Sequence, residues 1–173
     1  MQALADLNGG EMIAIIGCGN PNRRDDGVGP VVIDRLKARG IEHLGVKLFD
    51  ARTDGMSVMF AARGCTTLIV VDASKSGVEP GTIHEVPGVE LERAYSPGLN
   101  LHDFRWDAAL YAGRQIFRDA FPQDVTVLLI EASELDLGIG LSDVVACSAE
   151  KVVGRIEVLV AALIPGQQAC PVS

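Results

Sequence analysis

Short apolar runs alternate along this chain with longer segments whose apolar residues recur at a helical period, and this alternation constrains the fold more than any other feature. The run Thr67–Asp72 (TLIVVD) is the strongest example, because so apolar a run is typical of a parallel strand buried on both faces. The pattern predicts strands at 12–17, 46–50, 67–72, 82–86 and 125–130. It predicts helices at 28–39, 55–63, 103–120 and 144–163.

Strands that alternate with helices form βαβ units, in which the strands are parallel and the helices cover the sheet. We therefore predict an α/β fold, a three-layer α/β/α sandwich with a mostly parallel twisted sheet of about five strands. We expect residues 1–173 to form a single domain with its core at 12–165 and with flexible ends. Ligands bind beyond the carboxyl ends of such strands, so functional residues are expected directly after them.

Charge and cysteine content narrow the class of protein. The formal net charge is −8 and the pI about 4.8, and an acidic surface repels phosphate, so we expect no nucleic-acid partner. The four cysteines are dispersed without a C-x-x-C pair, which predicts reduced thiols rather than a zinc site or disulfides. The sequence shows no signal-peptide pattern and no apolar stretch near the roughly 20 residues of a membrane helix. We expect a cytoplasmic protein that does not associate with a membrane.

The first predicted strand is followed by Gly17-Cys18-Gly19-Asn20-Pro21 and then by the adjacent carboxylates Asp25 and Asp26. A dinucleotide fingerprint would need G-x-G-x-x-G, but position 22 is asparagine, and two carboxylates would face the pyrophosphate. Asp25 and Asp26 could cap the following helix, where the macrodipole favours acidic residues. Their place at the strand-end edge of the sheet makes a purely capping role for both the weaker interpretation.

Two further residues at predicted strand or loop ends could act with these carboxylates. Asp72 ends the most apolar strand, where it either accepts backbone N–H bonds from the next loop or faces a partner or metal. His102 precedes a predicted helix, and a lone histidine there is more often structural than a ligand. Together, however, Asp26, Asp72 and His102 form a set of two carboxylates and one imidazole suited to a first-row divalent metal.

From Ile13 to Leu163 the sequence resembles the hydrogenase maturation proteases, which mature nickel–iron hydrogenases. The family opens with an apolar strand, then G-x-G-N, then two acidic residues, a small residue and glycine. This chain carries that pattern from Gly17 to Gly29, with Asp25 and Asp26 as the acidic pair. Further similarities are the Thr53/Gly55/Met56 segment, the strand ending in Asp72, the Pro80-Gly81-Thr82 turn, His102 before its helix and Gly140-Leu141-Ser142 before the last helix.

The resemblance implies an α/β/α fold and an endopeptidase that removes a C-terminal extension from the large-subunit precursor of a nickel–iron hydrogenase. It implies that Asp26, Asp72 and His102 bind nickel already inserted in that precursor, so the free enzyme should hold nickel weakly. It also implies that no serine or cysteine nucleophile takes part. A metal-bound water is the simplest attacking group, with Asp25 as a possible base.

Two departures from the family pattern lie in loops expected to meet the substrate. Many relatives have two glycines where this chain reads Asp50-Ala51-Arg52-Thr53, and many have an apolar-Gly-x-x-Pro segment where this chain reads Ile130-Glu131-Ala132-Ser133. These departures bear on which hydrogenase is processed rather than on the metal site.

Two alternatives stay open from sequence. A peptidyl-tRNA hydrolase shares the G-x-G-N-P motif, but it would continue into an arginine–histidine–asparagine motif and needs a basic surface, whereas this chain has Arg24-Asp25-Asp26 and a charge of −8. A nickel-sensing chaperone that docks on immature hydrogenase without cutting it would use the same ligand set.

Overall fold

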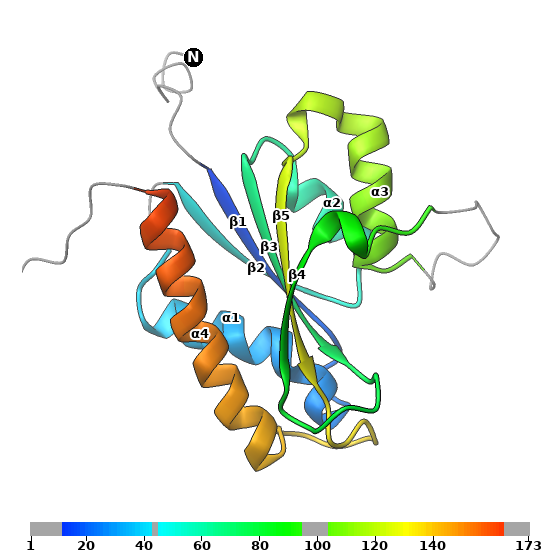
Figure 1. Cartoon of the computed structure of the whole chain (residues 1–173), viewed down its shortest axis with the longest axis vertical. Helices are drawn as coiled ribbons and strands as arrows, with labels where there is room; N and C mark the ends of the chain where they lie inside the picture. The colour runs from blue at the N-terminus through cyan, green and yellow to red at the C-terminus, as the bar shows by residue number, and fades with distance from the viewer. Residues whose placement is uncertain (1–11, 43–44, 95–103, 165–173) are drawn as a thin grey trace, which may run out of the picture.

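The computed structural model describes residues 12–42, 45–94 and 104–164, which form one five-stranded sheet with helices on both faces (Figure 1). The strands are β1 (Ile13–Cys18), β2 (Val46–Arg52), β3 (Thr67–Ser74), β4 (Ile83–Pro87) and β5 (Asp124–Glu131). The main helices are α1 (Val28–Ala38), α2 (Gly55–Ala62), α3 (Trp106–Phe117) and α4 (Asp143–Leu163). The predicted three-layer α/β/α architecture is confirmed.

The strand order in the sheet is β2-β1-β3-β5-β4, and it determines where a ligand is expected to bind. All neighbouring strands pair in parallel except β4, which lies at the edge and runs antiparallel to β5. The chain goes from β1 outward to β2 and then returns to β3 on the other side of β1. The carboxyl ends of β1 and β3 therefore flank a topological switch point, which is where open α/β sheets bind ligands.

The sheet is buried on both faces, and β1 shows why its sequence is a continuous apolar run. Ile13 and Ile15 pack into the core under α1 and α4, whereas Ala14 and Ile16 pack into the core under α2 and α3 (Figure 1). All four side chains are fully buried. Burial of one large aliphatic side chain contributes about 1.5–3 kcal/mol, so the central strands are the main source of stability.

The start and the end of α1 are both explained by the residues found there. In α1, Pro30 lies in the first turn, where its missing N–H breaks no helical hydrogen bond. The chain leaves α1 through Gly40, whose φ of +68° suits a residue without a side chain. Within the described residues, no helix combines the length and apolar character that crossing a membrane requires.

Several element boundaries differ from the sequence prediction near the functional edge, and those of β3 and α3 affect the site. Strand β3 continues past Asp72 to Ser74, because Ala73 and Ser74 pair with Ile130 and Glu131 of β5. The helix predicted at 103–120 begins only at Trp106, since Arg105 is extended with a φ of −92° and a ψ of 179°. It ends at Phe117 and is followed by a short 3-10 turn. The chain ends predicted to be flexible lie outside the described residues.

Candidate active site

Gly19 follows β1 directly and lets the loop after β1 pack against β3. Its φ is +114°, a conformation that favours glycine. A Cβ at this position would lie 1.8 Å from the carbonyl oxygen of Asp26 and 3.3 Å from Oδ1 of Asp72. The next residue, Asn20, donates its backbone N–H to Oδ2 of Asp26 over 3.1 Å. Absence of a side chain at Gly19 therefore brings the loop that carries Asp26 to the end of β3.

Asp72 is a buried carboxylate, 1% exposed, with different surroundings for its two oxygens. Oδ1 accepts the backbone N–H of Ala73 over 2.8 Å and lies on the side of Gly19. Oδ2 accepts the indole N–H of Trp106 over 2.7 Å and a guanidinium N–H of Arg105 over 2.9 Å. One bond thus comes from the following backbone, as the structural interpretation of Asp72 expects, but the other two come from side chains at the start of α3.

Burial raises the pKa of Asp72, and the negative charge of Asp26 acts in the same direction. The hydrogen bonds from Trp106 and Ala73 and the positive charge of Arg105 oppose that rise without cancelling it. The ionised form of Asp72 is therefore stabilised by the hydrogen-bond donors and the positive charge around it. A divalent cation near Oδ1 would stabilise the same ionised form.

Asp25 has a different environment from its neighbour Asp26. It is fully buried, and its carboxylate accepts hydrogen bonds from the backbone N–H groups of Ser133, Glu134 and Ser142 and from the Ser142 hydroxyl, at 2.7–2.9 Å. Burial alone raises the pKa of Asp25, but these bonds outweigh it and lower the pKa below its usual range. Asp25 therefore anchors the segment between β5 and α4.

The capping interpretation of Asp25 and Asp26 is wrong for the side chains. Neither the 3-10 turn Arg24–Gly27 nor α1 has a side-chain cap hydrogen bond. The physical reason is that both carboxylates have closer donors elsewhere: Asp25 in the segment before α4, and Asp26 at the backbone of Asn20.

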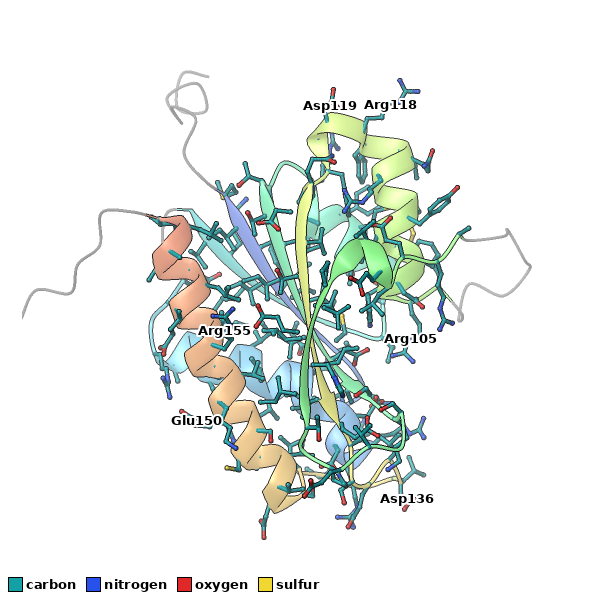
Figure 2. All side chains as sticks on the ribbon, viewed as in Figure 1. Arg105, Arg118, Asp119, Asp136, Glu150 and Arg155 are labelled. Atoms are coloured by element: carbon teal, nitrogen blue, oxygen red, sulfur yellow. The ribbon has the colours of Figure 1, made fainter. Side chains whose placement is uncertain are left out.

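A cavity of about 170 Å³ opens at this edge, and Asp26, Cys18, Arg105 and Trp106 are among its lining residues. A second cavity of about 370 Å³ is lined by Asp72 and again by Arg105 and Trp106, so these two residues border both cavities. Figure 2 labels Arg105 near the start of α3, on the side of the sheet opposite to α4.

Cys18 is the cysteine that lines the smaller cavity, and it is not suited to act as a nucleophile. Burial raises the pKa of its thiol well above the usual value, and the carboxylates of Asp72 and Asp50 raise it further. The thiolate is the reactive form, so a thiol held neutral in this way is inert.

The structure brings Asp26 and Asp72 to the same edge, whereas His102 lies outside the described residues. Among the described residues no group of three or more histidine, cysteine or acidic side chains could hold a metal. The two carboxylates fit a divalent cation as part of a larger donor set, because Oδ1 of Asp72 accepts the Ala73 N–H and has a second lone pair. Asp26 is half-buried and borders the smaller cavity.

Sequence reasoning missed Arg105 and Trp106, because both fall inside the predicted helix 103–120 and neither directly follows a predicted strand. One signal was available: a buried tryptophan usually finds a partner for its indole N–H. Trp106 is the single tryptophan of the chain and is 8% exposed.

The sequence profile that describes the hydrogenase maturation proteases matches residues 30–158, which is more than half of the chain. The chain belongs to the hydrogenase maturation protease family. The matched range begins after Asp25 and Asp26 and includes Asp72. Because the chain belongs to this family, the peptidyl-tRNA hydrolase alternative no longer applies.

Individual members of the family resemble this chain over different lengths. The hydrogenase 2 maturation protease of Escherichia coli is 27% identical over 146 residues, which cover 83% of this chain and 87% of that protein. The hydrogenase expression/formation protein HupM of Azotobacter chroococcum is 29% identical over 125 residues, 72% of this chain. The match spans only 59% of HupM, less than two thirds of its length.

The solved structure of the hydrogenase maturating endopeptidase HybD from Escherichia coli has a similar fold. The TM-score is 0.75 at 24% sequence identity, and the match covers 87% of this chain and 93% of HybD. At this identity the likeness shows that the two proteins share a fold.

One departure of this chain from the family pattern has a structural explanation. Glu131 is fully buried, and its carboxylate accepts bonds from the backbone N–H groups of Ser76 and Gly77 and from the hydroxyls of Ser74 and Ser76. Its side chain therefore holds the loop after β3 against β5. From the sequence we expect the segment Ile130-Glu131-Ala132-Ser133 to meet the substrate. The Glu131 side chain does not support that expectation, because it points into the protein and binds the loop after β3.

Proposed function

We propose that this chain is an endopeptidase that removes the C-terminal extension of a nickel–iron hydrogenase large-subunit precursor after nickel has been inserted. Family membership supports the reaction class. The observation that carries the proposal is the meeting of two acidic strand-end residues, Asp26 and Asp72, at Gly19.

Nickel enters this proposal as part of the substrate. Asp26 and Asp72, together with His102, would contact the nickel ion that the precursor carries, and the precursor would supply the remaining ligands. The described donors are carboxylates without a thiolate, and Cys18 stays protonated, which favours weak binding of nickel to the free protein.

The protein's own residues would position the scissile bond and the attacking water. A divalent cation can polarise a carbonyl and lower the pKa of a water molecule. Asp25 is a poor candidate for the base, because four donor groups occupy its oxygens. Asp26 is the better candidate, since it is half-buried and borders the smaller cavity.

Mass spectrometry of the large subunit before and after incubation tests this function. We expect the chain to reduce the precursor mass by the mass of its extension, and alanine in place of Asp26, Asp72 or His102 to prevent this. Asp119→Ala is the matched control, because Asp119 is exposed beyond the far end of α3 (Figure 2).

The non-cleaving chaperone makes a different prediction in the same experiment. It would form a complex with the nickel-loaded precursor, but the precursor mass would not change. Normal processing by all three alanine variants would contradict the assigned site while leaving the protease function in place.

A further inference from the structure

Arg105 is the cation that lies against the buried carboxylate of the proposed site. Its guanidinium donates to Oδ2 of Asp72 over 2.9 Å, and it is the only cationic side chain in the described part of the chain with an ion pair to Asp72. The side chain of Asp72 is 1% exposed and that of Arg105 is 58% exposed. The pair therefore joins a fixed, desolvated acceptor to a donor with room to move toward solvent.

The other charges around the smaller cavity have partners of their own. Arg52 pairs with Asp50 over 3.5 Å, and Asp54 accepts the backbone N–H of Met56 at the start of α2. Arg23 donates to the carbonyl oxygen of Leu135. Arg105 is thus the group that balances the charge of Asp72.

We propose that Arg105 is a specificity-determining residue that keeps free divalent cations out of the site and gives way only to a metal ion carried by the precursor. This inference rests on the proposed function, since it assigns the metal to the substrate. Two positive groups cannot both lie close to one buried carboxylate without repulsion. A free ion has to overcome that repulsion alone, whereas a docking precursor makes further contacts that offset it.

Trp106 binds the same carboxylate as Arg105 but should favour metal binding rather than oppose it. Its indole N–H is neutral and holds Oδ2 over 2.7 Å, so Oδ1 stays turned toward Gly19. Outer donors of this kind orient a metal-binding carboxylate and typically change metal affinity or activity roughly 10- to 100-fold when removed. Arg105 and Trp106 therefore bind the same oxygen but should change metal affinity in opposite directions.

The test is a titration of the free protein with NiCl2, followed by tryptophan fluorescence and by calorimetry. Trp106 is the only tryptophan, so its emission reports directly on Asp72. The titration is done at pH 8 to limit proton competition at the carboxylate. We expect Arg105→Gln to bind Ni²⁺ about tenfold more tightly than the wild type, or more, because a half-exposed charge has been removed.

Three variants control for charge, fold and site. Arg105→Lys keeps the positive charge and should bind Ni²⁺ as weakly as the wild type. Arg155→Gln removes an exposed arginine from α4, on the other side of the sheet, and should not change the affinity (Figure 2). Arg105→Gln combined with Asp72→Asn should lose the gained affinity. A fourth variant, Trp106→Phe, tests the opposite effect of the indole: it should bind Ni²⁺ more weakly than the wild type, as measured by calorimetry.

Equal or weaker Ni²⁺ binding by Arg105→Gln, or tight binding by the wild type, would overturn the role of Arg105. The titration contains no precursor, so it can fail or succeed independently of cleavage. In a cleavage assay, added free Ni²⁺ should inhibit Arg105→Gln at a lower concentration than the wild type. Absence of any cleavage by the wild type would contradict the proposed function but not the titration result.

Discussion

The indole N–H of Trp106 donates to Oδ2 of Asp72 over 2.7 Å and ties the first residue of α3 to β3. The bond helps to orient this carboxylate, together with the bonds from Ala73 and Arg105. Trp106→Phe keeps the ring and removes the donor, so we expect cleavage of nickel-loaded precursor to slow roughly 10- to 100-fold.

The stability of Trp106→Phe should fall by only about 1–2 kcal/mol, since the aromatic ring still packs. Tyr111→Phe, which removes a polar group from the same helix, is the control. Cleavage kinetics and denaturant unfolding separate the two effects, and an unchanged rate would show that Trp106 does not position Asp72.

Asp25 and Asp26 are neighbours in sequence, but their replacement should have different consequences. Asp25→Ala leaves four part-buried donor groups without their acceptor, so we expect a loss of roughly 3 kcal/mol in the free energy of unfolding. Asp26→Ala should change that free energy by less than about 1 kcal/mol and abolish cleavage. Urea unfolding combined with the cleavage assay checks both, and similar stability losses for the two variants would contradict the assigned roles.

The pH dependence of stability should reveal Glu131. Burial by itself raises the pKa of Glu131, but the backbone bonds from Ser76 and Gly77 and the serine hydroxyls outweigh it and lower the pKa from 4.5 to about 2. A carboxylate with a depressed pKa stabilises the folded state above its unfolded pKa and loses this contribution as the pH falls. The contribution should therefore be complete above pH 4.5 and disappear toward pH 2.

Glu131→Gln should consequently be about 2 kcal/mol less stable than the wild type at pH 7. The difference should shrink steadily from pH 4.5 downward, as measured by urea unfolding at several pH values. Glu134→Gln, at an exposed side chain, is the control. A difference that stays constant with pH would contradict the lowered pKa of Glu131.

Cys18 should be dispensable for chemistry although it lines the smaller cavity. Burial and the nearby carboxylates raise the pKa of its thiol, which keeps it protonated at neutral pH. Cys18→Ala should lose about 1 kcal/mol of stability through the small cavity it leaves, while the cleavage rate stays close to that of the wild type. Complete loss of cleavage in a folded Cys18→Ala protein would point to a thiol nucleophile instead.

The fold could be predicted from sequence because burial on both faces makes each central strand a continuous apolar run, as in Thr67–Asp72. The meeting of Asp26 and Asp72 could be predicted because the carboxyl ends of adjacent parallel strands reach the same edge. The roles of Asp25 and Glu131 could not be predicted from the sequence. Their donors lie 108–117 and 54–57 positions away in the sequence, and such contacts have no periodic signature.

The partners of Asp72 were likewise hidden from sequence reasoning. Arg105 and Trp106 reach Asp72 only because the chain is extended at Arg105 and the helix begins one residue later. The sequence pattern predicts a helix start at residue 103, three residues before the start in the structure, and a periodic pattern does not fix a helix start to within so few residues. The role of His102 remains a prediction.

Recognition of substrate-borne nickel is the central claim, and its physical basis is the cost of ordering a flexible extension. Fixing a peptide backbone costs roughly 1–2 kcal/mol per residue, and contacts to a shared metal ion can offset that cost while placing the bond near Asp26 and Asp72. Without the ion, the carboxylates have no substrate cation to attract.

The most direct measurement incubates three substrates in parallel with the wild-type protein and follows their masses: nickel-loaded precursor, nickel-free precursor and an isolated peptide spanning the cleavage site. We predict that only the nickel-loaded precursor is cut, and that replacing His102 removes its cleavage as well. Equal cleavage of the nickel-loaded and nickel-free precursors would contradict recognition through the metal.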